Sequence, residues 1–332
     1  MGVLLKDVAK ALNLSKATVS WILSGKGDEK GFSEATIKLV KETAAKMGYS
    51  PNLLARSLSL GTTHTVALII PAIGDTFYSQ MAQAVEKQAH QRGYTLIISS
   101  SESNADKERR LISALRAQQV DGLIIAPSKG EDSAIRRMIK DHYPFVFIDR
   151  YYPELETNYV IVDNEGSSRE IVQRLIGDGC RRIALMTTDT HLYVMSRRTN
   201  GYLAALKEAG IDVDPSLCVG LDRARYREAI VEELDALLAR CPDVDGFFFS
   251  THYLALETIR YFIKRGIDYR KRFRFACFHT TAALDILAPE MYVTLMPIEK
   301  MGTMAVDILL DNIASKEDYR PQGVVLENTI LS

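Results

Sequence analysis

The chain has 332 residues, of which 47% are hydrophobic and 25% are charged, and its formal net charge is −1. This composition excludes a disordered, collagen-like or membrane-spanning protein, and the length exceeds what one hydrophobic core usually serves, so we expect two or three domains. Charge is distributed unevenly, because residues 1–61 hold eight lysines and one arginine against five acidic residues. The resulting net +4 in this short segment favours a module that binds a polyanion, although a solvated basic face would give the same count.

The first residues, MGVLLKDVAKAL, become charged and helical at once and lack the apolar segment of a secretory signal, which predicts a cytoplasmic protein. The four cysteines are scattered without a CxxC pair, a distribution typical of reduced thiols and not of a disulfide or zinc framework. We therefore expect no metal site and no cofactor.

Three short helices are predicted before residue 49. Apolar residues at helical spacing indicate a helix over 5–12, Ser15 is a favourable N-cap for a second helix over 16–23, and Ser33 caps a third that ends at Gly48. Two short helices joined by a tight turn, with a third behind them, form a helix-turn-helix unit.

Trp21, the only tryptophan, lies on the second of these helices. It is about 200° around the helix from Val19, so it cannot share the buried face and should point outward beside Ala17. The second helix of such units enters the major groove of DNA. Lys16 can reach a guanine edge or a phosphate, and Ala17 and Trp21 suit a thymine methyl group. The alternative is that the indole folds back on the following loop or on the third helix.

The residues LKDVAKALNLSKATVSWILSGKG and FSEATIKLVKETAAKMGYSPNLLARSL resemble those of the lactose and galactose repressor family of bacterial transcription regulators, and the resemblance continues through the chain. It implies a homodimer that binds a pseudo-palindromic DNA operator. Trp21 stands where this family often has arginine or another polar residue, and GDEKG lengthens the loop that follows. The predicted DNA contacts are Lys6, Ser15, Lys16, Ala17, Thr18, Ser20, Trp21, Lys26, Asn52, Ala55, Arg56 and Leu58.

Residues 51–58 resemble the hinge helix of this family, which is too short to be stable alone and is expected to order when paired on DNA. The resemblance implies that Leu58 enters the minor groove as a wedge, with Ala55 close to it. The alternative is a plain linker that ends at residues 61–63.

From Thr65 onward, apolar runs alternate with amphipathic helices, which predicts parallel sheets of the doubly wound kind in two lobes. The expected strands are 65–71, 94–101, 122–127, 145–149, 159–163, 182–188, 246–251 and 273–278. The expected helices are 78–92, 107–118, 131–140, 166–176, 198–209, 226–238 and 254–264.

The family resemblance implies that this α/β body is periplasmic-binding-protein-like. We expect an all-α DNA-binding domain over 1–50, a hinge helix and linker over 51–61, and an effector-binding and dimerisation domain over 62–332. The first lobe would hold 62–161 and 294–320, including a long helix over 298–314. The second lobe would hold 162–293 and 321–332, including a final strand over 324–330.

A small-molecule effector is expected between the lobes, at the carboxyl ends of the strands. The predicted effector-binding residues are Phe77, Tyr78, Asp149, Arg150, Asp163, Arg198, Thr251, His252 and His279. Arg198 matches the arginine that in this family holds effector hydroxyls or carboxylates. Asp163 could instead be a helix N-cap.

Two departures from the family pattern bear on the effector. Thr251-His252 replaces a common Asn-Asp, and His279 replaces the aspartate that accepts hydroxyl hydrogen bonds in sugar-binding members. The cleft is therefore less acidic, which favours a sugar acid or sugar phosphate with Arg198 and His279 facing its charge. A neutral sugar and a site without an effector are the alternatives.

Two other classes of protein were weighed against a DNA-binding regulator. The chain lacks GxGxxG, GxxxxGK[ST] and GxSxG motifs, which disfavours a doubly wound enzyme. An extracellular solute-binding protein would have a secretory signal and no basic helix-turn-helix.

Overall fold

The computed structural model describes residues 3–49, 61–128, 130, 133–188, 192–223, 225–315 and 320–331. The chain divides into two compact units, Met1–Thr63 and His64–Ser332. The hinge contacts predicted at Asn52, Ala55, Arg56 and Leu58 lie outside the described residues. None of the helices in the described ranges is long and apolar enough to cross a membrane.

The first unit contains the three predicted helices, α1 (Leu5–Ala11), α2 (Lys16–Leu23) and α3 (Glu34–Lys46). Both serine caps form as expected, because the side-chain oxygen of Ser15 accepts a hydrogen bond from the backbone N–H of Thr18 and that of Ser33 accepts one from Thr36. The small core of this unit consists of Val8, Ala9, Val19, Ile22, Val40 and Ala44.

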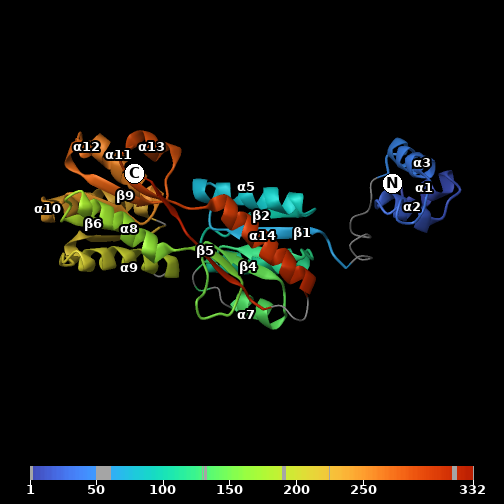
Figure 1. Cartoon of the computed structure of the whole chain (residues 1–332), viewed down its shortest axis with the longest axis horizontal. Helices are drawn as coiled ribbons and strands as arrows, with labels where there is room; N and C mark the ends of the chain where they lie inside the picture. The colour runs from blue at the N-terminus through green and yellow to red at the C-terminus, as the bar shows by residue number, and fades with distance from the viewer. Residues whose placement is uncertain are drawn as a thin grey trace. The chain divides into compact units, whose positions relative to one another are not determined.

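The second unit contains two six-stranded sheets, one in each lobe (Figure 1). In the first lobe the strand order is β11-β5-β4-β3-β1-β2, and every neighbouring pair is parallel. These strands are β1 (Thr65–Ile70), β2 (Thr95–Ser100), β3 (Gly122–Ile125), β4 (Phe145–Ile148), β5 (Tyr159–Val162) and β11 (Gly323–Leu326).

In the second lobe the order is β12-β10-β9-β8-β6-β7, and only β12 is antiparallel to its neighbour. These strands are β6 (Ile183–Thr188), β7 (Cys218–Leu221), β8 (Gly246–Phe249), β9 (Arg274–Phe278), β10 (Tyr292–Leu295) and β12 (Thr329–Leu331). In both sheets the strand order reverses beside the first strand of the lobe, which is where doubly wound sheets bind ligands. The predicted fold class is confirmed.

Helices cover both sheets. Those of the first lobe are α5 (Thr76–Gln91), α6 (Ala105–Ala117), α7 (Ser133–Lys140) and α14 (Ile298–Ser315). Those of the second are α8 (Asn164–Gly177), α9 (Tyr193–Glu208), the 3-10 turn η1 (Pro215–Leu217), α10 (Tyr226–Arg240), α11 (His252–Lys264), α12 (Tyr269–Arg272) and α13 (Ala282–Leu287). Helix α14 lies along α5 and packs on β3, β4 and β5, so the chain returns to the first lobe as expected (Figure 1).

The predicted final strand over 324–330 is wrong, because two strands occupy this segment. Strand β11 pairs with β5 in the first lobe, and β12 then pairs with β10 in the second lobe. The polar pair Glu327 and Asn328 separates the two short strands, and Nδ2 of Asn328 donates to the backbone oxygen of Asp163 at 3.2 Å. The end of the chain is therefore another crossing between the lobes.

Candidate functional site

The exposed side of α2 carries four of the predicted DNA contacts. Lys16, Ala17, Ser20 and Trp21 are all exposed, while Val19 of the same helix is buried. Positions three or four residues apart share a helix face, as 16 and 20, 17 and 20, and 17 and 21 do, so these four side chains form one surface. Ser15, Lys6 and Lys26 are exposed beside this helix, and Thr18 is half-buried.

The indole of Trp21 points outward from α2 and also contacts the following loop, so features of both expected arrangements are present. It lies on the outside of α2 and keeps 41% of its surface exposed. It also stacks on Phe32 of the following loop, with ring centroids 6.5 Å apart, and the Nζ of Lys30 lies 5.4 Å from the ring centroid. The lengthened loop therefore supports the indole from one side and places a cation against it. The sequence suggested a contact with this loop as the alternative, but it did not single out Phe32 or Lys30, because neither follows Trp21 at a helical spacing.

A polar cavity lies between the lobes, where several strands end. Eight of the nine predicted effector-binding residues line it, all except Asp163. We call it the inner cavity, and its volume is about 40 Å³. This space holds about one water molecule, since one water occupies about 30 Å³ in the liquid.

Arg198 of α9 is the central cation of the inner cavity. It is 4% exposed, and its Nε and Nη1 donate to the side-chain oxygen of Asn164 at 2.8 Å and to the backbone oxygen of Ser250 at 2.7 Å. Its guanidinium carbon lies 3.7 Å from the centroid of the Phe278 ring. Burial lowers the pKa of Arg198 to about 10, so the side chain remains charged at neutral pH. The two oxygens that accept hydrogen bonds from Arg198 belong to an amide side chain and to the backbone, so neither carries a charge.

The first lobe contributes a chain of polar contacts to the same cavity. The hydroxyl of Tyr78 donates to Oδ2 of Asp149 at 2.7 Å, and the same oxygen lies 3.7 Å from Nε of Arg150. Burial is the largest cause that raises the pKa of Tyr78 well above its usual value. Asp149 has a φ of 65°, and His279 of the second lobe has a φ of 74°. Non-glycine residues rarely adopt this left-handed conformation, and it is concentrated at binding sites.

An ion pair and a contact to a histidine cross the cleft and connect the lobes at the inner cavity. Asp75, the N-cap of α5 in the first lobe, lies 3.6 Å from Nη2 of Arg223 and 3.5 Å from Nε2 of His252 in the second lobe. Sequence reasoning missed Asp75 and Arg223 as cleft residues. Asp75 precedes a helix and looks like an ordinary cap, and Arg223 lies in a loop without a pattern.

His279 lies at the end of β9 with both ring nitrogens buried and without hydrogen-bond partners among the described residues. Its ring is 5.3 Å from that of Phe77 and 5.6 Å from that of His252. Burial, with smaller contributions from His252 and Arg198, lowers the pKa of His279 to about 3. Two donor or acceptor nitrogens left without partners in a polar cavity favour contact with a bound molecule.

Asp163 does not line the inner cavity. It is exposed and caps α8, because its Oδ1 accepts a hydrogen bond from the backbone N–H of Gly166 at 2.9 Å. Asp163 is therefore a helix N-cap, the alternative given for it above, and is not part of the predicted effector site.

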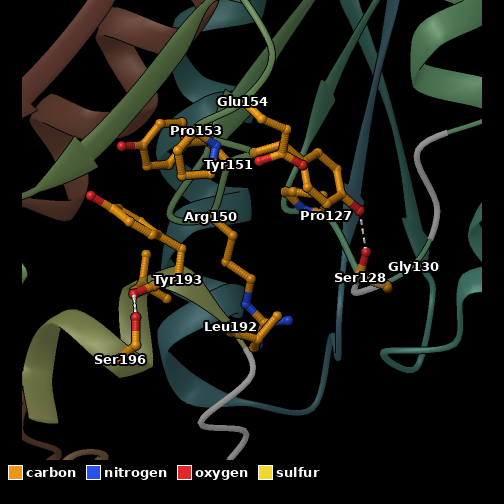
Figure 2. A pocket seen from close by; sticks show the side chains of 12 residues that line it. Pro127, Ser128, Gly130, Arg150, Tyr151, Pro153, Glu154, Leu192, Tyr193 and Ser196 are labelled. Carbon is orange, nitrogen blue, oxygen red and sulfur yellow. Dashed lines mark hydrogen bonds between the residues drawn. The ribbon is translucent and has the colours of Figure 1, made fainter.

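A second and larger cavity, of about 460 Å³, lies in the same unit (Figure 2). We call it the outer pocket. Three segments line it, namely the loop after β3, the loop after β4 and the first turn of α9. Arg150 lines both cavities. The described residues contain no group of three His, Cys, Asp or Glu side chains able to hold a metal ion.

The low pKa of His279 makes stability depend on pH. A histidine in the unfolded chain titrates near pH 6.5, whereas folded His279 takes up a proton only near pH 3. Between these values the unfolded state binds more protons, so the free energy of unfolding falls as the pH falls. We expect the titration of this residue to lower the free energy of unfolding by about 2 kcal/mol between pH 7 and pH 5.

His279→Asn tests this expectation in urea unfolding at the two pH values, since asparagine tolerates the left-handed backbone. The variant should lose less stability than the wild type on going to pH 5. His90→Gln, at an exposed position of α5, should retain the wild-type difference. An equal loss in the wild type and in His279→Asn would contradict the buried neutral state of His279.

Comparison with known proteins covers both units. Residues 4–52 match the model described as "Bacterial regulatory proteins, lacI family". Residues 63–255, more than half of the chain, match "Periplasmic binding proteins and sugar binding domain of LacI family".

Similar proteins include catabolite control protein A of Priestia megaterium, which is 29% identical over 93% of this chain and 92% of its own length. The transcriptional regulator CelR of Thermobifida fusca is 29% identical over 98% and 96%. A solved complex of a regulator CelR with cellobiose is 27% identical, covers 99% of this chain and 98% of its own, and has a TM-score of 0.73. A lac repressor dimer bound to operator has the same fold, with a TM-score of 0.84 at 20% identity and coverage of 100% and 98%.

A helix-turn-helix unit joined to a two-lobed α/β unit with a polar cleft is the organisation of a DNA-binding regulator controlled by a small molecule. This chain belongs to the LacI family of bacterial transcription regulators.

Proposed function

We propose that the chain is a repressor that binds a pseudo-palindromic operator as a homodimer, and that a small sugar-like effector between the lobes changes its operator affinity. In this proposal residues 1–50 bind DNA, 51–61 couple the units, and 62–332 bind effector and dimerise. The observation that carries it is the buried cation of Arg198, whose two hydrogen-bond acceptors are neutral oxygens, in a cleft lined by both lobes. An effector that contacts both lobes can favour one arrangement of the lobes, and a coupling of about 1–3 kcal/mol is usual.

Charge counting favours an anionic effector. Arg150, Arg198 and Arg223 line the inner cavity together with only two aspartates, Asp75 and Asp149. Each aspartate is already close to an arginine, Asp75 to Arg223 at 3.6 Å and Asp149 to Arg150 at 3.7 Å. Burial lowers the pKa of both histidines in the cavity, which keeps them neutral. One positive charge is therefore left for a sugar acid or sugar phosphate.

The two alternative functions lack support in the relatives. Those similar along nearly the whole chain are transcription regulators, which favours a non-enzymatic protein that acts on DNA in the cytoplasm. An extracellular solute-binding protein would not require a helix-turn-helix unit with the exposed α2 surface.

The proposal is tested by operator selection from a random duplex pool, followed by fluorescence anisotropy of the selected duplex with sugar acids, sugar phosphates and neutral sugars. We expect a two-fold symmetric site and a change in affinity with acids of at least about 5-fold. A response to neutral sugars alone would reject an anionic effector, and failure to select any site would reject the regulator itself.

Trp21 should determine part of the operator sequence. We expect Trp21→Ala to change the preference at one base pair in each half-site, with a loss of discrimination of about 1–3 kcal/mol, because apolar contact with a base edge is removed. Selection should be repeated with Trp21→Phe, which keeps a ring, and with Leu39→Ala, which removes an exposed apolar residue of α3. Unchanged preference with weaker binding would mean that the indole only supports Phe32 and Lys30.

A further inference from the structure

The inner cavity is too small for a sugar ring. It has about 40 Å³ because the protein's own side chains occupy the space between the lobes, with Asp75 close to Arg223 and His252, and Tyr78 bonded to Asp149. Pockets that enclose small molecules measure about 300–1,000 Å³. A ring in the inner cavity would require these contacts to break, whereas a carboxylate is small enough to approach without breaking all of them.

The outer pocket has the required size, at about 460 Å³, and its walls are largely apolar and aromatic. Tyr151 follows β4 in the first lobe and Tyr193 begins α9 in the second, and their rings meet edge to face with centroids 5.3 Å apart (Figure 2). The ring of Tyr159 lies 4.4 Å from that of Tyr151 and holds it in place. Aromatic rings in a partly apolar pocket suit the flat C–H face of a sugar ring.

A negative and a positive side chain lie at different places in the lining of the outer pocket. Figure 2 shows the Glu154 carboxylate and the guanidinium of Arg150 apart from each other among the lining residues. Arg150 is 4% exposed, and its Nε has no hydrogen-bond partner among the described residues. The nearest acceptor to this Nε is Oδ2 of Asp149 at 3.7 Å, which is beyond hydrogen-bond distance, so the guanidinium can still bind the carboxylate of a ligand, whose shape fits its fork. Glu154 is exposed and would accept hydrogen bonds from hydroxyl groups while repelling an acid group.

We propose that the effector is a cyclic sugar acid whose ring lies in the outer pocket against Tyr151 and Tyr193, with its carboxylate directed at Arg150 and the inner cavity. This assignment rests on the proposed function and specifies the effector class and its position. Because the two tyrosines belong to different lobes, a ring packed on both ties the lobes together.

The assignment is tested by calorimetric titration of the full chain with two sets of matched probes. One set is galacturonate, galactose and galactonate, and the other is glucuronate, glucose and gluconate. Each contains a cyclic acid, the same ring without the acid, and an open-chain acid. We expect a cyclic acid to bind at least about 10-fold more tightly than either partner of its set, because only it uses both the aromatic wall and the guanidinium.

Three variants locate the ring of the cyclic acid. Tyr193→Ala should weaken its binding by about 10-fold or more, while Tyr193→Phe, which retains the ring, should bind within about 3-fold of the wild type. Tyr193 is 38% exposed, so its loss leaves the core intact. His279→Asn changes the inner cavity, which the carboxylate approaches and the ring does not enter, so it should weaken binding of the cyclic acid much less than Tyr193→Ala does.

The opposite results would overturn the assignment. Binding that depends on His279 and not on Tyr193 would place the ring in the inner cavity, and equal binding of neutral sugars would exclude the carboxylate contact. If no probe binds, the outer-pocket site is rejected. The proposed function is judged by a separate test. That test consists of operator selection and of the response of operator affinity to sugar phosphates and other sugars, and neither depends on Tyr193.

Discussion

Gly201→Ala is expected to destabilise the second unit by about 3 kcal/mol, the largest single stability effect that we predict. Helices α8 and α9 pack closely here, so a Cβ at residue 201 would lie 2.3 Å from the backbone oxygen of Glu165 and 2.7 Å from Cβ of Ser168. Neither atom belongs to a flexible side-chain end, so the helices must separate. Urea unfolding followed by circular dichroism measures the loss.

Gly177→Ala is the matched control on the neighbouring helix. A Cβ at residue 177 would meet no atom within 4 Å, so replacing this helical glycine should cause no loss and a gain of up to about 1 kcal/mol. If Gly201→Ala were as stable as the wild type, the close approach of α8 and α9 would not constrain the fold.

Arg198→Met is expected to weaken effector binding by about 100-fold or more, because the variant keeps side-chain length but removes a buried, charge-assisted donor set. It should also lower stability by about 1–3 kcal/mol, since the oxygens of Asn164 and Ser250 lose their donors. Titration with the tightest-binding probe and urea unfolding of the same protein measure the two effects.

Arg169→Met provides the control, because its side chain is 49% exposed, forms a surface ion pair with Glu208 and lines neither cavity. Surface pairs of this kind contribute about 0–1 kcal/mol, so effector binding should stay at the wild-type level. Full effector binding by Arg198→Met, with only stability reduced, would make Arg198 a structural residue and would remove the main support for the proposed effector site.

Much of the fold follows from local patterns. Serine caps and helical spacing place α2 and α3 correctly, because a cap is decided by a few neighbouring residues. Long apolar runs such as 65–70 identify the central strands, which are buried on both faces. The short strands β7, β10 and β12 were not anticipated as separate elements, because three or four residues that mix exposed and buried positions leave no recognisable pattern.

Most residues of the candidate site follow from the rule that ligands bind at strand ends. That rule selected Tyr78 and Asp149 without knowledge of any contact, the family resemblance selected His279, and the structure brings all three to one cavity. It also selected Asp163, which caps a helix instead, since a strand-end aspartate serves either role equally well by sequence.

The sequence by itself determined the class of fold, the exposed surface of α2 around Trp21 and the residues that end the cleft strands, because these depend on spacing within one element. Only the tertiary structure decided that β11 returns to the first lobe, that Asp75 faces Arg223, and that the cleft is nearly filled at one end and open beside Tyr151 and Tyr193. Such features depend on which distant segments the fold brings together, and on how much volume their side chains leave, which no local pattern encodes.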